Sequence, residues 1–260
     1  MWSLGDYARL AELLEPHAEA LAAACQIDAG TTVLDVAAGN GNFAIAAARR
    51  GARVVATDLT SRMVELGRER SAAAGLSIEW SEADAEQLPF ADSTYDLVAS
   101  VFGAMFAPQP NLVAHELFRV ARPGGMVAMA NYGPGGFLGR LTDLIASFSA
   151  RPALPLPSPF EWGDEDELRR RFAGLASSIE VYHRTLEFEA LSPQSFLRFW
   201  DETNPPQAAL RAVLPPETYQ KALTQRLVLV EELNESREGR LKLSSPYILV
   251  LARKALTDPS

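Results

Sequence analysis

Residues 32–44 (TVLDVAAGNGNFA) most constrain the fold of this chain, because they predict a buried strand that runs through a glycine turn into a helix. The run TVLDV is apolar and favours a strand buried on both faces, and FAIAAARR from Phe43 onward has helical periodicity. Between them, Gly39 and Gly41 allow close approach to the backbone. This order is typical of an α/β protein with a mostly parallel sheet, and the turn predicts a bound ligand.

The charge beside the turn narrows the choice of ligand. Gly39-x-Gly41-x-x-Ala44 satisfies the relaxed dinucleotide pattern, in which amides at a helix N-terminus receive a pyrophosphate. Asp35, at the end of the strand, would repel a pyrophosphate and attract a cation. The turn therefore favours an adenosine ligand that carries positive charge.

This stretch resembles motif I of the class I S-adenosylmethionine (SAM)-dependent methyltransferases, an acidic residue followed by x-Gly-x-Gly-x-Gly. SAM carries a sulfonium and an ammonium, so the resemblance gives Asp35 a cationic ligand. Two positions depart from the pattern, with Ala37 at the first glycine and Asn42 at the last. Alanine needs room for one methyl group and is expected to be tolerated, whereas the sequence offers no reason for Asn42.

The second predicted strand, 53–57, ends at Asp58. An acidic residue about 20 residues beyond the glycine loop can accept hydrogen bonds from both ribose hydroxyls. NAD-binding proteins share this feature, so Asp58 indicates an adenosine ligand without choosing the cofactor. The alternative is that Asp58 only caps the helix expected at 61–71.

The methyltransferase resemblance extends to the next two loops. It implies apolar contacts from Leu59 and Met63 to the adenine or ribose. After a third strand at 76–80, the acidic-Ala pair followed by Leu-Pro-Phe is a frequent form of the adenine loop, in which Asp84 accepts from the exocyclic amine and Ala85 offers its amide. The alternative for Asp84 is an acidic surface turn.

The fourth predicted strand, 95–102, should direct its C-terminal end into the crevice where open α/β sheets bind ligands. Ser100, Phe102 and Phe106 are therefore expected to line the cofactor or substrate pocket, with plain core packing as the alternative for each. An aromatic ring near a sulfonium is favourable because the ring face attracts a cation.

Helical spacing over 6–26 predicts two N-terminal helices with a break at Pro16. The simpler interpretation is a helix packed beside the sheet. In the family that the chain resembles, such helices commonly fold over SAM, which would place Trp2 and Tyr7 over the cofactor.

Beyond Tyr132 the pattern predicts insertions around two further strands. Prolines make 152–159 irregular, Asp164 is a plausible helix cap, and helices are expected at 138–149, 193–201, 207–213 and 217–235. The resulting division is 1–29 for the N-terminal helices, 30–132 for the cofactor-binding Rossmann-like core, 133–177 for an irregular and helical insertion, 178–188 and 246–254 for the terminal strands, and 189–245 for a helical substrate cap. The fold expected is a Rossmann-like seven-stranded, mostly parallel sheet with helices on both faces.

Charge and composition restrict the partners. The formal net charge of −9 argues against nucleic acid, which requires clustered Lys and Arg. Cys25 is the only cysteine, no apolar stretch is long enough to insert into a membrane, and the start MWSLGDYARL lacks the pattern of a secretory signal. We expect a cytoplasmic monomer or homodimer.

The resemblance is greatest to the ubiquinone/menaquinone-biosynthesis and small-molecule tailoring methyltransferases. It implies transfer of a methyl group from SAM, with S-adenosylhomocysteine as product, to O, N or C of a small acceptor, and no metal. No catalytic group is identified; the candidate bases are Tyr132, His17, His183 and Asp201. The candidate substrate contacts are aromatic: Phe106, Tyr132, Trp162, Phe199 and Trp200.

Two other functions are compatible with the same motifs. A SAM-binding protein without methyl transfer would have the same motifs. An NAD-dependent oxidoreductase would explain the turn and Asp58, but it gives no purpose to Asp35 or to the loop at Asp84 and Ala85.

Overall fold

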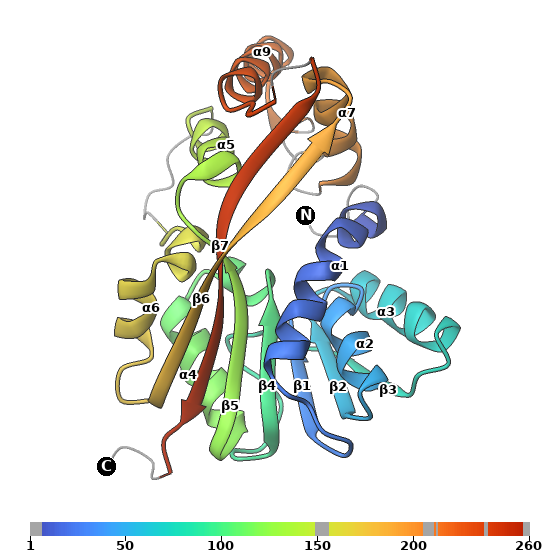
Figure 1. Cartoon of the computed structure of the whole chain (residues 1–260), viewed down its shortest axis with the longest axis vertical. Coiled ribbons are helices and arrows are strands. Elements are labelled where there is room, and N and C mark those ends of the chain that lie inside the picture. Colours follow the sequence, from blue (N-terminus) through green and yellow to red (C-terminus); the bar gives the residue numbers. More distant parts are fainter. Residues whose placement is uncertain (1–6, 149–155, 205–210, 212, 237–238, 257–260) are drawn as a thin grey trace.

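The computed structural model of the chain describes residues 7–148, 156–204, 211, 213–236 and 239–256. In this part of the chain, seven strands form a sheet of order β3-β2-β1-β4-β5-β7-β6 (Figure 1). The strands are β1 (Thr32–Val36), β2 (Arg53–Asp58), β3 (Ile78–Glu82), β4 (Tyr95–Val101), β5 (Ala121–Tyr132), β6 (Ala176–Ala190) and β7 (Leu241–Lys254).

The first five strands pair in parallel, β7 is antiparallel to β5, and β6 is antiparallel to β7. The predicted seven-stranded, mostly parallel sheet is therefore confirmed. The strand order reverses between β1 and β4, and ligands of open α/β sheets bind at the carboxyl ends of the strands beside such a reversal.

Helices lie on both faces of the sheet, with α1 and α2 in front of it in Figure 1 and α4 behind. The helices of the core are α1 (Tyr7–Ala24), α2 (Asn42–Arg49), α3 (Ser61–Ala73), α4 (Pro110–Val120) and α6 (Glu165–Arg171), with short 3-10 turns η1 (Ala104–Phe106) and η2 (Pro159–Gly163). Asp164 caps α6 as predicted, because its side chain accepts from the Glu167 amide.

The predicted break at Pro16 is wrong, because α1 is one helix with Pro16 inside it. An interior proline removes one helical hydrogen bond, at a cost of about 3 kcal/mol. The helix persists because Leu14, Ala18 and Leu21 are buried on its inner face. This burial offsets the lost bond and holds α1 against the core.

The cap consists of the outer ends of β6 and β7 with α5 (Gly136–Ala146), α7 (Pro193–Thr203) and α9 (Pro216–Glu232), and it stands above the core in Figure 1. The two strands are longer than predicted and stay paired out to Ala190 and Leu241. Residues 241–245, expected in the helical cap, therefore belong to β7. The helix predicted at 207–213 falls almost wholly outside the described residues.

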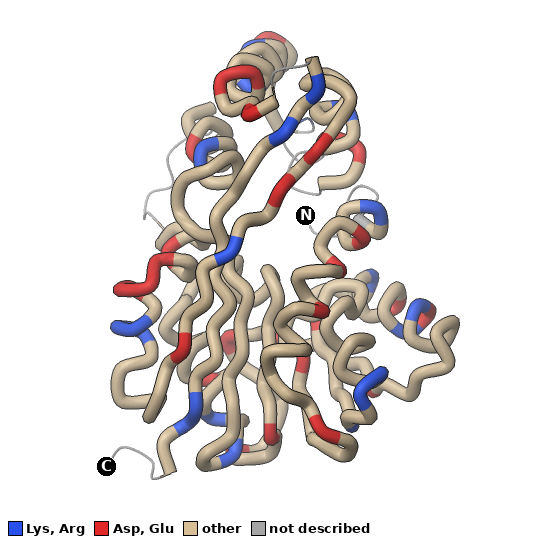
Figure 2. Tube along the Cα trace, viewed as in Figure 1, with Lys and Arg blue, Asp and Glu red and all other residues tan. Residues whose placement is uncertain are grey.

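Charges of both signs are interspersed along the helices and the β6–β7 pair, and no single basic face is formed by the residues drawn in colour in Figure 2. Over the described part of the chain, no helix has both the length and the apolar character needed to cross a membrane.

Candidate functional site

A cleft of about 260 Å³ opens at the carboxyl ends of the parallel strands. Its walls come from the loops after β1, β2, β3 and β4, which the strand-order reversal brings together. The lining residues are Ala37, Gly39, Asp58, Leu59, Met63, Ala83, Asp84, Ala85, Glu86, Phe102, Gly103, Ala104, Phe106, Ala107 and Pro108.

The glycine turn is held in place by its neighbours on both sides. The Gly39 amide donates to Asp58 Oδ2 at 2.9 Å, and the Ala38 amide donates to the Thr57 carbonyl at 2.8 Å. On the other side, a Cβ on Gly103 would lie 2.2 Å from the Ala37 carbonyl oxygen, so this position accepts only glycine without a shift. The turn is therefore fixed between β2 and the loop after β4.

Ala37 has a left-handed backbone, with φ at +54°. A residue with a Cβ is disfavoured there by about 1–2 kcal/mol relative to glycine, which explains the glycine of the usual motif. As expected, there is room for the methyl group of Ala37. The free-energy cost of alanine at this position comes from its left-handed backbone and not from lack of space.

Asp35 lies beneath the turn rather than on the wall of the cleft. Its side chain is 1% exposed and Oδ2 accepts from the Ala44 amide at 2.9 Å, whereas the buried Oδ1 has no partner among the described residues. Burial, reinforced by the charge of Asp58, raises the pKa of Asp35 to about 8. Asp35 instead borders a small cavity with Leu14 and Phe102. A cation bound nearby would favour the ionised form of Asp35 and lower this pKa.

Asp58 faces the cleft and also organises the backbone around it. Its Oδ1 accepts from the amide and the hydroxyl of Thr60 at 3.0 and 3.1 Å, while Oδ2 accepts from Gly39. Asp58 does not cap α3 itself, because it bonds Thr60, the residue before the helix, and that end of α3 has no side-chain cap bond. A carboxylate has about four acceptor sites, so these contacts leave capacity for ligand hydroxyls.

The loop after β3 closes the far wall. Asp84 Oδ1 accepts from the Glu86 amide at 2.9 Å, and Glu86 in turn accepts from the backbone and side-chain nitrogens of Gln109. Ala85 is buried against the core. Asp84 is thus an exposed turn residue, as the alternative proposed, but it also borders the cleft.

The charges of the lining are all of one sign. They are the carboxylates of Asp58, Asp84 and Glu86, and no Lys or Arg lines the described cleft. A pyrophosphate would meet repulsion, whereas hydroxyl and amine donors or a cation would be favoured.

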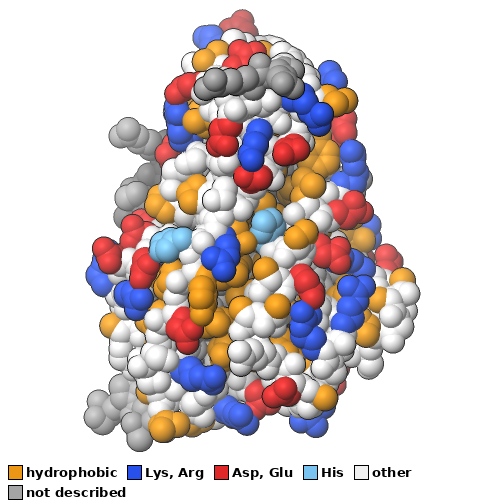
Figure 3. Space-filling model, in the orientation of Figure 1, with side chains coloured by type: hydrophobic (Ala, Val, Ile, Leu, Met, Phe, Trp, Pro, Cys, Tyr) orange, Lys and Arg blue, Asp and Glu red, His pale blue; other side chains and the backbone are white. Residues whose placement is uncertain are grey.

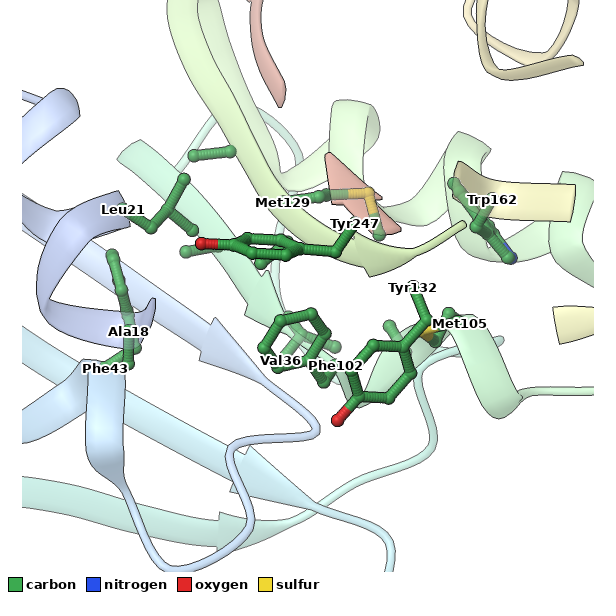
Figure 4. Packing of buried hydrophobic residues seen from close by; sticks show 14 of the residues in the cluster. Ala18, Leu21, Val36, Phe43, Phe102, Met105, Met129, Tyr132, Trp162 and Tyr247 are labelled. Atoms are coloured by element: carbon green, nitrogen blue, oxygen red, sulfur yellow. The ribbon is translucent and has the colours of Figure 1, made fainter. Parts of the chain in front are cut away.

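Aromatic rings form the end of the cleft nearest β5. Phe102, whose φ is +53°, stacks on Tyr132 with ring centroids 4.1 Å apart and an interplanar angle of 7°. Phe106 lines the same end from η1. Figure 4 shows the Phe102 and Tyr132 rings side by side, with Met105 beside them.

Several predicted site residues lie away from this cleft. Gly41 packs against the Trp80 ring, which a Cβ would approach to 2.7 Å, and the Ser100 hydroxyl accepts from the Ala104 amide in the core. Tyr7 begins α1, but its side chain is not among those described, and Trp2 lies outside the described residues.

Of the predicted substrate aromatics, only Phe106 lines the cleft, while Tyr132 stacks on the lining residue Phe102. Trp162 is 1% exposed and packs on Phe172 in the core, and Trp200 belongs to the aromatic cluster of the cap. Phe199 lies under the guanidinium of Arg9, at 5.1 Å, where α7 meets α1. Trp162 therefore belongs to the core, Phe199 and Trp200 belong to the cap, and none of the three borders the described cleft.

The candidate bases differ in their surroundings. His183 is exposed and contacts Glu165 on α6, and Asp201 pairs with the buried Arg226, so both serve surface or packing roles. His17 lies on α1 beside Phe102, with ring centroids 6.2 Å apart. Neither His17 nor Tyr132 is among the lining residues, but both rings contact Phe102, which is.

Sequence reasoning missed six lining residues: Ala83, Glu86, Gly103, Ala104, Ala107 and Pro108. Most are small residues in the loops that flank predicted strands, and their position after β3 and β4 was the signal available. The structure also explains Asn42, whose Nδ2 donates to the Ala11 carbonyl at 2.7 Å while Oδ1 accepts from Arg70. Asn42 therefore ties the glycine turn to α1.

Comparisons with known proteins agree with this geometry. A family described as a methyltransferase domain matches residues 33–125. The uncharacterised protein Rv1403c of Mycobacterium tuberculosis is 45% identical over 189 residues, which are 72% of this chain and 68% of that protein. Demethylmenaquinone methyltransferase of Clavibacter sepedonicus is 36% identical over 174 residues, 61% of this chain and 69% of that protein. The crystal structure of YcgJ from Bacillus subtilis superposes with a TM-score of 0.65 at 18% identity, covering 92% of this chain and 98% of that one, and shows the shared fold.

Proposed function

Since the chain belongs to the class I SAM-dependent methyltransferases, we propose that it transfers a methyl group from SAM to a small-molecule acceptor. The observation that supports this most is the described cleft, which combines three carboxylates, the fixed glycine turn and an aromatic end.

The residues fit SAM on chemical grounds. Asp58 has acceptor capacity for the ribose hydroxyls, and Asp84 with Ala85 borders the cleft where the adenine loop is expected. The turn at Ala37 and Gly39, with the unpartnered Oδ1 of Asp35 beneath it, suits the cationic methionine end. A pyrophosphate cofactor such as NAD would be opposed by the same carboxylates.

SAM, when bound, supplies an already activated methyl group, so the chain needs no nucleophile of its own. Its residues have to orient the acceptor and exclude water. The Phe102 ring, backed by the stacked Tyr132 ring, presents a flat apolar surface for this purpose, and α1 lies close by at His17.

The acceptor that fits this end of the cleft is small, apolar or aromatic, and without strong negative charge. The aromatic lining favours a flat molecule, and the acidic rim opposes a polyanion. Quinone-like compounds belong to this class, as do many secondary metabolites. Methyl transfer of the EC 2.1.1 type to O, N or C would serve such acceptors.

The test is transfer of labelled methyl from SAM into a panel of phenols, indoles, amines and quinols. Label in at least one acceptor is expected, while SAM binding with no transfer to any of them would instead favour a SAM-binding protein. Asp58→Ala should weaken SAM binding about 5- to 150-fold, since losing charge-assisted hydrogen bonds costs about 1–3 kcal/mol.

Glu65→Ala is the matched control, because Glu65 is an exposed carboxylate on α3 outside the cleft lining. It changes the net charge equally and should leave SAM affinity unchanged. Equal affinities for the Asp58→Ala protein and the wild type would contradict the assignment of Asp58 to the ribose.

A further inference from the structure

His17 and Tyr247 form a hydrogen-bonded pair behind Phe102, just outside the cleft lining. His17 Nδ1 lies 2.9 Å from Tyr247 Oη, joining α1 to β7. Their rings meet edge-on with centroids 5.1 Å apart, and both rings also contact Phe102 edge-on, at 6.2 and 5.5 Å. Figure 4 shows the Tyr247 hydroxyl directed toward α1.

The pair lies one ring away from the cleft. Phe102 lines the cleft on one side and, with Leu14, the small cavity under α1 on the other. Leu14 is on the same helix face as His17, so α1 brings the imidazole to the back of the Phe102 ring. Figure 3 shows apolar side chains exposed in the middle of this face of the molecule, between α1 and the β6–β7 pair, which gives a small apolar molecule a surface to approach.

The protonation states of the pair suit proton transfer. Burial lowers the pKa of His17, so the imidazole is neutral at neutral pH, and burial raises the pKa of Tyr247, so the phenol stays protonated. The contact between Nδ1 and Tyr247 Oη is compatible with either neutral tautomer, and in the one that donates from Nδ1 the Nε2 lone pair is available. Nε2 makes no hydrogen bond to the described residues, and His17 is only half-buried.

The charged surroundings of the pair are sparse. Phe102 on β4 contributes only a ring, and the charged neighbour from the sheet is Arg184 on β6, which is paired in register with Tyr247 and acts against the rise in its pKa. Among the described residues, no carboxylate acts on the pKa of either ring and none forms an ion pair with His17 that would hold it as a structural imidazolium.

We propose that His17, oriented by Tyr247, is the proton acceptor for an acceptor molecule that carries an ionisable hydroxyl. This deepens the proposed methyl transfer and rests on it. The hydroxyl proton passes to His17 Nε2, and the oxygen electron pair forms the new O–CH3 bond while the S–CH3 bond breaks and leaves its electron pair on sulfur. The imidazolium then returns the proton to solvent. His17 is the catalytic residue in this proposal, and Tyr247 is a positioning residue.

The experiment compares wild type, His17→Gln and Tyr247→Phe on phenols of graded acidity, with SAM affinity and thermal stability measured for each. Glutamine can still donate to Tyr247 but cannot take up a proton. We expect His17→Gln to lower kcat by about 10²-fold or more on weakly acidic phenols, the usual contribution of a general base, and far less on a nitrophenol that is already ionised. SAM affinity should not change.

A second readout does not depend on turnover. Absorbance of bound 4-nitrophenol, with S-adenosylhomocysteine present, should show a larger phenolate fraction near neutral pH for the wild type than for His17→Gln. The chain has three histidines, so His17 can also be followed by NMR, where Tyr247→Phe should shift its titration.

The outcomes separate the two proposals. If His17→Gln lowers kcat equally on all phenols and leaves the phenolate fraction unchanged, His17 is not the base. The pair would then be only a structural contact between α1 and β7. Transfer to amines with none to phenols would overturn the hydroxyl acceptor while leaving methyl transfer intact. Absence of transfer to any acceptor would count against the proposed function itself, and the phenolate measurement would still decide whether His17 takes up the proton.

Discussion

Asn42→Ala tests how the cofactor turn is joined to α1. The substitution removes the bond from Nδ2 to the Ala11 carbonyl and the bond that Oδ1 accepts from Arg70. A neutral bond contributes about 0.5–1.5 kcal/mol and one to a charged group about 1.5–3 kcal/mol. Arg70 is partly exposed and keeps Glu15 as an ion-pair partner at 3.2 Å. The free energy of unfolding should therefore fall by about the sum of the two lower values, about 2 kcal/mol.

The assay is chemical and thermal unfolding, with amide exchange across α1. A loss of about 2 kcal/mol lowers Tm by about 4–8 °C in a chain of this size, and exchange should accelerate in the turns of α1 around Ala11. A double-mutant cycle with Arg70→Ala should give a coupling energy of about 0.5 kcal/mol or more, because the two side chains share a contact. Stability changes below about 0.5 kcal/mol, or strict additivity with Arg70→Ala, would refute the role assigned to Asn42.

Three further predictions concern the turn and the carboxylate beneath it. The pKa of Asp35 is raised to about 8 in the folded protein, so the folded state binds the extra proton and stability should fall as pH rises from about 4 to about 8, by at most about 1.4 kcal/mol per pH unit. Asp35→Asn should flatten that part of the stability profile, and an unchanged slope in denaturant titrations would disprove the cause. Gly103→Ala should destabilise the protein and weaken SAM binding, because the new Cβ would meet the Ala37 carbonyl. Gly139→Ala on α5 is the control; its Cβ would lie 3.7 Å from the nearest atom, so it should be neutral or stabilising by up to about 1 kcal/mol. Equal effects of the two substitutions in thermal melts would contradict the packing argument. Ala37→Gly should raise Tm slightly, since it relieves a left-handed alanine worth about 1 kcal/mol, and a lower Tm would show that the methyl group contributes contacts that matter more.

The sequence predicted the parts of the fold and cleft that depend on local pattern. The apolar runs gave the core strands in order, and Gly39, Asp58 and Asp84 follow strands whose carboxyl ends meet at one edge of the sheet. Their convergence follows from parallel pairing alone. The ligand that they bind stays a prediction.

Features set by contacts between distant segments could not be predicted. The sequence around Asn42 does not indicate that Ala11 and Arg70 are its partners. The sequence around His17 likewise does not indicate Tyr247. Pro16 was predicted to end a helix because a local rule cannot weigh the burial of Leu14 and Ala18 around it.

The start of β7 was misjudged for a related reason. The predicted strand began at residue 246, which is a proline and cannot donate to a neighbour in the ladder. In the structure β5 ends at Tyr132, opposite Tyr247, and the Gly133 amide just beyond it donates to the Pro246 carbonyl, so Pro246 takes part as an acceptor while the strand continues along β6 to Leu241. The missing donor therefore breaks no ladder bond to β5.

The most direct test of the central claim is calorimetric titration of the purified protein with SAM, S-adenosylhomocysteine and NAD. The carboxylate-lined cleft predicts binding of SAM and S-adenosylhomocysteine at one site per chain, lost or weakened in Asp58→Ala, and no measurable binding of NAD. Tight NAD binding with no signal from SAM would contradict the account.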